Sequence, residues 1–252
     1  MVKISAIVTV YNGQDYLEEC LASIFVQTMK DMEIIVSNDG STDGTRQILE
    51  RYRDKIVILD QPHQGVSRAL NNGIAHASGD YVAYLAHDDW WEPKKLSTEF
   101  EFMEKYGVGV VYSDFYRVYP DGSKVLTPTP EFDKEALRKQ CFINISSSMI
   151  DRRFLNQLRI RDGHFFDENL VSAMDWDLWI RLSELCAFHR IPIPLAYYRL
   201  HAQQWSQSRP GVYRWSHLRA RCRVCRRYNG FDPRRCARRC LGLVFSQILH
   251  VK

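Results

Sequence analysis

The chain has 252 residues and a mass of 29.6 kDa, and 45% of its residues are hydrophobic while 25% are charged. This composition is typical of a globular protein and excludes collagen, a coiled coil and disorder over the whole chain. No stretch approaches the ~18 uninterrupted apolar residues of a membrane-spanning helix, and the N-terminus lacks the apolar core and cleavage site of a signal peptide. We therefore expect a cytoplasmic protein.

Strand and helix patterns alternate over the first half of the chain. Short apolar runs predict strands, and apolar side chains at helical spacing predict the helices between them. Strands are expected at 4–10, 32–37, 56–59, 81–86 and 108–119, and helices at 15–27, 42–52, 67–77 and 93–106. Strands separated by helices of this length imply βαβ units and a parallel sheet flanked by helices.

The second half is mixed. Helices are expected at 132–140 and 175–185, strands at 145–150, 188–191 and 195–199, and helical structure from 212 onward. No internal repeat or linker divides the chain. The simplest organisation is one α/β domain, residues 1–207, followed by a helical C-terminal extension, residues 208–252.

The net charge of +4 hides an asymmetry. Residues 209–239 contain eleven Arg, no Lys and one acidic residue, Asp232. That segment carries +10 and the rest of the chain −6. Such a basic segment contacts the phosphates of lipids or nucleic acid, or it is a solvated helix face, and both interpretations stay open.

The C-terminal cysteines have a spacing that is close to that of a zinc site. Four of the seven cysteines form C-x2-C and C-x3-C pairs, separated by ten residues: Cys222, Cys225, Cys236 and Cys240. The spacing is not that of a common zinc motif. A structural zinc site and free thiols on a helical pair are both left open.

Polar residues follow the first two predicted strands. Ligands of open parallel sheets bind beyond the carboxyl ends of the strands. Asp39, after the second strand, can accept hydrogen bonds from a base or ribose, or it can form an Asx turn. Asp43 is the better candidate to cap the helix that follows, which leaves Asp39 for a ligand. Gly13 stands alone, so the glycine-rich motifs of dehydrogenases and P-loop enzymes are absent.

Two adjacent carboxylates, Asp88 and Asp89, follow the fourth strand. A cation relieves their repulsion, and oxygen ligands suit Mg²⁺ or Mn²⁺. Asp175 lies in the first turn of a predicted helix, where the helix dipole favours an anion and a general base can face a cleft. His201 is either a metal ligand or a satisfied polar group, and its position alone does not decide between them.

Over residues 3–207 the chain resembles the family 2 inverting glycosyltransferases of GT-A fold. The resemblance rests on segments that stand in the order of the family: VTVYNGQDYLEECLASIFVQT, SNDGSTDGT, GVSRALNNGIAHASGDYVAYLAHDDWWEPKKL, SSSMIDRRF, DGHFFDENL, MDWDLWIRL and PLAYYRLH. It implies a GT-A fold, with a Rossmann-like and mostly parallel sheet.

The resemblance also implies a role for each candidate residue. Nucleotide binding is implied for Thr9, Tyr11, Asn12, Asp39 and Arg68, the last at the diphosphate. The other implied roles are a divalent metal, Mn²⁺ or Mg²⁺, for Asp88 and His201, the donor sugar for Asp89 and the catalytic base for Asp175.

The function implied by the resemblance is inverting transfer of a sugar from a nucleoside-diphosphate sugar, with a UDP-sugar favoured, to an acceptor hydroxyl. We expect a glycan or lipid-linked acceptor in the synthesis of cell-surface polysaccharide or glycan. The eleven-Arg segment would then hold the protein peripherally at the anionic inner face of a membrane. Nucleic-acid binding is disfavoured because it leaves the aspartates unexplained.

Two departures from the family pattern support an alternative. Ala86 stands where the first acid of the D-x-D motif is expected, and Met174 where an acidic residue usually precedes the base. The alternative is a catalytically impaired protein that binds a nucleotide-sugar without turning it over. A nucleotidyltransferase is disfavoured because the chain lacks the glycine-rich basic motif after its first strand.

Overall fold

The computed structural model describes residues 2–158, 164–170 and 172–204. The elements up to the fourth strand are β1 (Ile4–Val10), α1 (Leu17–Phe25), β2 (Met32–Asn38), α2 (Thr45–Arg51), β3 (Val57–Asp60), α3 (Val66–His76) and β4 (Tyr81–Ala86). They alternate as the sequence predicts, with ends that differ from the prediction by at most three residues.

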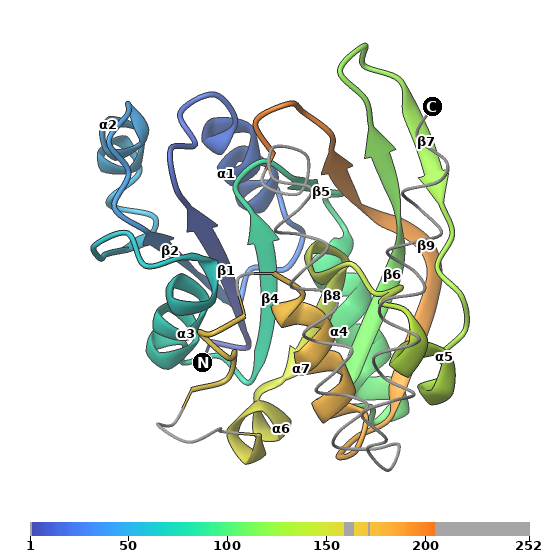
Figure 1. Cartoon of the computed structure of the whole chain (residues 1–252). Coiled ribbons are helices and arrows are strands. Elements are labelled where there is room, and N and C mark those ends of the chain that lie inside the picture. The colour runs from blue at the N-terminus through green and yellow to red at the C-terminus, as the bar shows by residue number, and fades with distance from the viewer. Residues whose placement is uncertain (1, 159–163, 171, 205–252) are drawn as a thin grey trace, which may run out of the picture.

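The later elements are more varied. They are β5 (Trp90–Trp91), α4 (Lys95–Tyr106), β6 (Val110–Val118), β7 (Lys124–Thr127), α5 (Lys134–Lys139), the 3-10 turn η1 (Ile145–Ser147), β8 (Ser148–Asp151), α6 (Arg152–Gln157), α7 (Met174–Leu182) and β9 (Phe188–Arg199). All the strands described join one sheet in the order β3-β2-β1-β4-β8-β6-β9-β5, with β7 paired to β6 (Figure 1).

The strand directions bring the carboxyl ends of several strands to one edge of the sheet. β1 runs parallel to β2 and β4, and β2 runs parallel to β3. β8 is antiparallel to both β4 and β6, so β6 regains the direction of β4, and β9 runs parallel to β6. The carboxyl ends of β1, β2, β4, β6 and β9 therefore meet at one edge. The strand order reverses between β1 and β4, which is the switch point where such sheets bind ligands.

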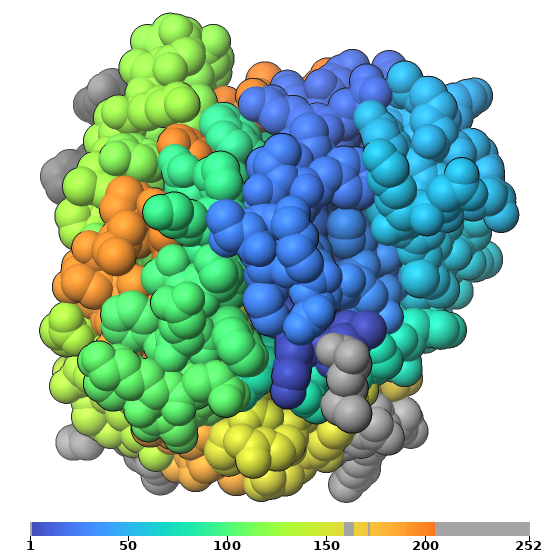
Figure 2. All heavy atoms as spheres, turned by 180° about the vertical axis from the view of Figure 1, so that it is seen from behind, coloured from blue at the N-terminus to red at the C-terminus, as the bar shows by residue number. Residues whose placement is uncertain are grey.

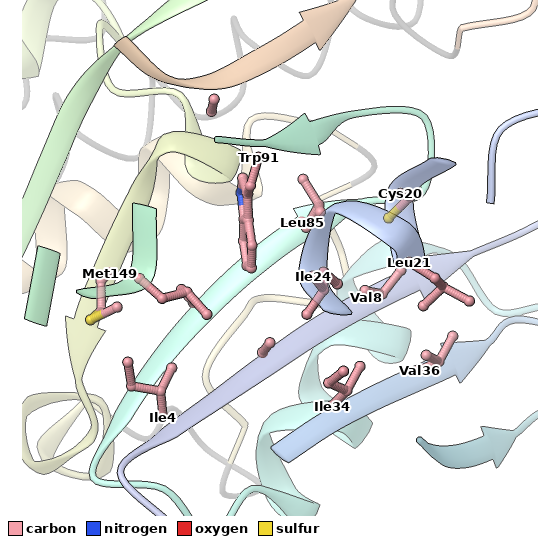
Figure 3. Close-up of a cluster of buried hydrophobic side chains, with 14 of the residues drawn as sticks. Ile4, Val8, Cys20, Leu21, Ile24, Ile34, Val36, Leu85, Trp91 and Met149 are labelled. Carbon is pink, nitrogen blue, oxygen red and sulfur yellow. The ribbon is translucent and has the colours of Figure 1, made fainter. Parts of the chain in front are cut away.

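Helices cover both faces because the side chains of each strand alternate between them. From β1, Ile4 and Val8 enter a core with α1 and α4, and Ile7 enters a second core with α3 and α7. Figure 3 shows the first core, where Leu21 and Ile24 of α1 lie over β1 near Leu85 and Trp91.

On the face behind the sheet, α1 lies beside α4 (Figure 2), and α2 packs into the same core. Helices α1 and α4 are joined by polar contacts at the end of α1. The amide of Leu96 donates to Gln27 Oε1 at 3.0 Å, and the hydroxyls of Thr28 and Ser97 are 2.7 Å apart. These contacts fix the loop that leaves α1 against the start of α4.

Five elements differ from the sequence prediction. The strands β5 and β7 and the helix α6 were not expected, β9 is one strand rather than two, and the 3-10 turn η1 takes the first three residues of the strand expected at 145–150. The Asn144 side chain starts that turn, because its Oδ1 atom accepts a hydrogen bond from the Ser146 amide at 2.8 Å. Pro192 and Pro194 favour a break, but the register shift opposite Ser113 and Asp114 lets β9 pass these prolines and continue. A bulge is one of the few places where a strand tolerates proline. The helix after Pro93 begins at Lys95, so Pro93 precedes its first turn.

The predicted extension at residues 208–252 and the cysteines Cys222, Cys225, Cys236 and Cys240 lie outside the described residues. The domain boundary therefore stays a prediction, and the choice between a zinc site and free thiols stays open. Within the ranges that the structure describes, no helix is both long and apolar enough to cross a bilayer.

Candidate active site

The loops at the switch point between β1 and β4 pack closely on each other. A Cβ atom at Gly13, after β1, would lie 2.4 Å from the Cδ2 atom of His87, after β4. Only glycine allows this approach. His87 is partly buried at this contact, and burial lowers its pKa because the charged imidazolium loses hydration. The lone Gly13 of the sequence therefore serves packing at this point.

Asp88 and His201 meet beside this loop. The Asp88 Oδ2 and His201 Nε2 atoms are 3.0 Å apart, although the residues are 113 positions apart in the chain. His201 follows β9, and its ring packs on that of Tyr16 with centroids 4.7 Å apart. Its second ring nitrogen, Nδ1, is buried and has no hydrogen-bond partner among the described residues. Burial opposes ionisation of Asp88, but the His201 hydrogen bond and the charges of His87 and His201 outweigh it and lower the Asp88 pKa.

Both carboxylate oxygens of Asp89 accept hydrogen bonds from other parts of the protein. Its Oδ2 atom accepts a hydrogen bond from Ser146 Oγ at 2.8 Å, and its Oδ1 atom accepts one from the Arg199 amide at 3.0 Å. Burial, and then the charge of Asp88, raise its pKa well above the ordinary value. Asp89 thus ties the loop after β4 to η1 and to the end of β9. Its predicted contact with the donor sugar stays a prediction.

Arg199 is a residue of the site that the sequence analysis did not single out. Its Nε atom donates to the backbone oxygen of Asp88 at 3.0 Å, and its guanidinium forms an ion pair with Glu19 of α1. The guanidinium carbon also lies 4.8 Å and 4.4 Å from the ring centroids of Tyr16 and Trp90. Arg199 therefore fastens β9 to α1 and to the Asp88 loop. Its place two residues before His201 was the available signal.

Asp39 is buried at the carboxyl end of β2, where its oxygens are taken up by the loop before α3. Its Oδ1 atom accepts hydrogen bonds from Gln61 Nε2 at 2.7 Å and the Gln64 amide at 2.9 Å. Its Oδ2 atom accepts one from the Gly65 amide at 2.8 Å and lies 2.8 Å from His63 Nδ1. Asp39 is thus less free than the sequence suggested.

Asp43 was expected to cap α2, but the N-cap residue is Gly44 and Asp43 lies just before it. Its Oδ1 atom accepts a hydrogen bond from the Thr45 amide at 3.0 Å. Its Oδ2 atom accepts one from the Gln14 amide at 3.1 Å and joins the loop after β1 to α2.

The other nucleoside candidates lie at the end of β1. Tyr11 is 42% exposed, and its ring stacks on that of His63 with centroids 3.9 Å apart. Thr9 is buried, with its hydroxyl 2.9 Å from that of Tyr84. Asn12 adopts a left-handed conformation, φ 50°, and its Oδ1 atom accepts a hydrogen bond from the Thr42 amide at 2.8 Å. The structure therefore brings these residues to the same edge as Asp39.

Arg68 lies in the first turn of α3 and forms an ion pair with Glu168. This partner belongs to the segment that leads to α7, so Arg68 links α3 to that segment. Its predicted contact with a diphosphate stays a prediction.

Asp175 lies in the first turn of α7. Its Oδ1 atom accepts a hydrogen bond from the Trp176 amide at 2.8 Å, and Ala173 before it has the unusual φ of 59°. Burial raises the pKa of Asp175, which makes it a stronger base than an ordinary aspartate. α7 ends at Leu182, shortly before β9 starts at the amino edge of the sheet, so Asp175 lies toward the carboxyl edge (Figure 1).

The donor atoms at this edge fit a hard divalent cation in part. No group of three or more His, Cys, Asp or Glu side chains suited to a metal occurs in the described part of the chain. The Asp88 Oδ2 and His201 Nε2 atoms share a hydrogen bond at 3.0 Å, and loss of its proton would leave an oxygen and a nitrogen close enough to bind one ion. Magnesium-type ions usually take only one or two protein ligands and complete their shell with phosphates and water.

Comparisons with known proteins identify relatives of the chain. The family model described as "Glycosyl transferase family 2" matches residues 5–166. The hyaluronan synthase of Pasteurella multocida is 30% identical over 225 residues, which cover 85% of this chain and 22% of the synthase. An uncharacterised glycosyltransferase of Rickettsia prowazekii is 32% identical over 206 residues, which cover 80% of this chain and 65% of that protein. The chain spans about a fifth of the hyaluronan and chondroitin synthases that it matches.

Solved structures share its fold. S. aureus TarS 1–349 in complex with UDP-GlcNAc has a TM-score of 0.71 at 20% identity, over 94% of this chain and 70% of that chain. The mannosyltransferase PcManGT from Pyrobaculum calidifontis in complex with GDP-Man and Mn²⁺ has a TM-score of 0.66 at 17% identity, over 91% of this chain and 65% of that chain. The family match covers residues 5–166, which contain nearly all residues of the strands from β1 to β8, and the TM-scores show a shared fold. The chain therefore belongs to glycosyl transferase family 2 and has the GT-A fold that the sequence predicts.

Proposed function

We propose that the chain transfers a sugar, with inversion at its anomeric carbon, from a nucleoside-diphosphate sugar to a hydroxyl of a glycan or lipid-linked acceptor. The observation that carries the proposal is the Asp88–His201 pair, 3.0 Å apart at the switch point of the sheet. A UDP-sugar is the favoured donor, since TarS has been solved with UDP-GlcNAc. The match to hyaluronan synthase supports a role in polysaccharide or glycan synthesis.

Asp88 and His201 would hold Mn²⁺ or Mg²⁺ together with the donor diphosphate. Such an ion neutralises the negative charge of the diphosphate and makes it a better leaving group. The lowered pKa of Asp88 keeps its carboxylate ionised, as a metal ligand must be. Arg199 and Asp89 hold the loop of Asp88 and the strand of His201 in register.

Asp175 acts as the general base of the proposed reaction. Its carboxylate takes the proton of the acceptor hydroxyl while the hydroxyl oxygen forms a bond to the anomeric carbon. The bond from that carbon to the diphosphate oxygen breaks on the opposite face, so the configuration inverts and a nucleoside diphosphate leaves. The raised pKa of Asp175 favours acceptance of the proton.

Calorimetric titration of UDP, GDP and dTDP, each with and without Mn²⁺, tests the binding half of the proposal. We expect one nucleotide to bind in a metal-dependent manner and Asp88→Asn to weaken that binding at least tenfold. Asp80→Asn is the matched control, because Asp80 is an exposed aspartate paired with Lys3 and has no contact with the pair. Absence of binding by all three nucleotides would contradict the proposal.

Release of sugar from the donor that matches this nucleotide tests the catalytic half. We expect the wild-type protein to transfer or hydrolyse the sugar, and Asp175→Asn to bind nucleotide without turnover. Binding without turnover in the wild-type protein would identify it as the impaired protein that Ala86 and Met174 suggest.

A further inference from the structure

His63 lies in the loop between β3 and α3, at the same edge of the sheet as the nucleoside candidates. Its imidazole lies nearly flat on the ring of Tyr11, with centroids 3.9 Å apart and planes inclined by 19°. The side chains of His63 and Tyr11 are both close to half exposed. A stacked partner at this distance covers one face of the tyrosine ring, which is the surface that a nucleobase would use for stacking.

The same imidazole also contacts Asp39. Three of the hydrogen bonds that Asp39 accepts come from fixed groups, namely the amides of Gln64 and Gly65 and the side chain of Gln61. Gln61 is itself held in place, because Asn72 Nδ2 donates to its Oε1 atom at 3.1 Å. The fourth partner, His63 Nδ1, lies 2.8 Å from Asp39 Oδ2 and belongs to an exposed side chain. It is therefore the exchangeable partner of Asp39.

The backbone of His63 is fixed while its side chain is able to rotate. A Cβ atom at Gly40 would lie 2.6 Å from the His63 amide nitrogen, so the two backbones are in tight contact. Gly40 also has a φ of +72°, which glycine adopts without strain. Departure of the imidazole from Tyr11 and Asp39 thus requires rotation of the side chain alone.

We infer that His63 occupies the place of the nucleobase in the ligand-free protein and that the base must displace it to bind. The imidazole supplies what a base would supply, namely a flat ring on Tyr11 and an N–H directed at Asp39 Oδ2. This inference rests on the proposed function. The apparent affinity for the nucleotide is then reduced by the fraction of molecules in which His63 is in place. An aromatic pair of this kind lowers it about twofold to tenfold.

Titration of UDP, in the presence of Mn²⁺, into His63→Ala and His63→Phe tests the inference. We expect His63→Ala to bind UDP about twofold to tenfold more tightly than the wild-type protein. His63→Phe keeps a ring over Tyr11 and is expected to gain less than His63→Ala. His76→Ala is the matched control, because His76 is exposed at the other end of α3 and contacts Asn72, and we expect no change.

Proton NMR of the imidazoles gives a readout that does not depend on variants. The His63 imidazole is stacked on the Tyr11 ring, so the resonance of its Cε1 proton carries a ring-current shift in the free protein. Saturating UDP is expected to remove that shift and to leave the His76 resonance in place.

Two results would overturn the inference while the proposed function stands. They are UDP binding to His63→Ala that is equal to or weaker than wild type, and a His63 resonance that saturating UDP leaves unchanged. Weaker binding of UDP to His63→Ala would instead show that His63 contacts the bound base. Failure of UDP, GDP and dTDP to bind any of the proteins would overturn both the inference and the proposed function.

Discussion

Asp88 and Asp89 are neighbours in the chain, yet their surroundings push their pKa values in opposite directions. Asp88 is paired with His201, which lowers its pKa, whereas burial and the charge of Asp88 raise the pKa of Asp89. The two titrations are coupled, because ionisation of one carboxyl disfavours ionisation of the other. The pair therefore presents its negative charge on the Asp88 side, toward His201.

Replacement of Asp89 tests whether its hydrogen bonds to Ser146 of η1 and to the Arg199 amide of β9 stabilise the fold. Asp89→Ala leaves the Arg199 amide without an acceptor, and we expect the free energy of unfolding to fall by about 1–3 kcal/mol. Asp89→Asn keeps an acceptor oxygen and is expected to be at least as stable as wild type. Urea denaturation measures both, and equal stability of the Ala and Asn variants would contradict this role.

The pH dependence of the same variants has a definite sign. Because the folded-state pKa of Asp89 is raised, ionisation destabilises the folded wild-type protein as the pH rises above the ordinary aspartate value, ~3.9. Asp89→Asn lacks this penalty. The stability of Asp89→Asn relative to wild type is therefore expected to increase with pH, from the ordinary aspartate pKa up to the raised pKa of Asp89 in the folded protein.

Asp175 is the proposed general base, and its buried environment disfavours its ionised form. Burial raises its pKa, so the rate of transfer should fall on acidification at a higher pH than an ordinary aspartate would give. Asp175→Asn is expected to lower the rate of transfer about 10²–10⁴-fold and to raise the melting temperature at neutral pH, since a buried charge is removed. Initial rates and thermal melting test this, with Asp80→Asn as the control. Full activity in Asp175→Asn would assign the base to another residue.

Among the residues of the site, the topological rule predicted the position of some and missed others. Asp39, Asp88 and Asp175 could be placed at the carboxyl edge because each follows a strand or begins a helix in a recognisable pattern. His63 and Arg199 were missed, because their contacts depend on how the loop before α3 and the end of β9 return to that edge. The loop of His63 follows a parallel strand, and this signal would have pointed to it.

At the scale of elements, the residues that form β1 to β4 were predicted because strand and helix periods alternate clearly there. β5 has two residues and exists through its pairing with β9, so no local pattern can reveal it. β9 was predicted as two strands because its two prolines lack backbone N–H donors. In the structure, a bulge in the pairing with β6 accommodates these prolines within one strand. Tertiary pairing thus decided the elements that local sequence left uncertain.

Helix α4 carries a buried ion pair. Lys95 and Glu99 are fully buried, with Lys95 Nζ 4.4 Å from the ring centroid of Trp91. The Glu99 Oε1 atom has no hydrogen-bond partner among the described residues. Desolvation lowers the pKa of Lys95 and raises that of Glu99, so burial disfavours both charges. Such a pair contributes little net stability, although each charge depends on the other.

Single and double substitutions distinguish the net stability that the pair contributes from the dependence of each charge on its partner. Lys95→Met leaves Glu99 uncompensated and is expected to reduce the free energy of unfolding by about 3–5 kcal/mol. Lys95→Met combined with Glu99→Leu is expected to recover most of that loss. Urea denaturation of both variants measures the difference, and a double variant that is no more stable than the single one would contradict the expectation.

At the scale of the whole molecule, charge is divided between the described domain and the segment 209–239, which carries eleven Arg. We propose that this segment holds the protein on anionic membrane, near a lipid-linked acceptor. Each basic side chain near such a surface contributes about 1 kcal/mol, and salt screens the attraction.

Sedimentation with vesicles tests the membrane proposal. The full chain should sediment with vesicles rich in anionic lipid, be released by salt and fail to bind neutral vesicles. Arg→Gln substitutions at positions 226, 227, 234 and 235 should weaken sedimentation. Exchange of the exposed Arg51 and Arg53 for Gln is the control, and an equal effect of both sets would argue against a specific role for the segment.

The Asp88–His201 pair joins the middle of the chain to the end of its last described strand. During synthesis Asp88 is made 113 residues before His201, so a growing chain contains the aspartate long before its partner. The pair forms only once β9 has been made and has docked on β6. A chain that ends just before β9 therefore contains Asp88 and the nucleoside candidates and still lacks the centre proposed for metal binding.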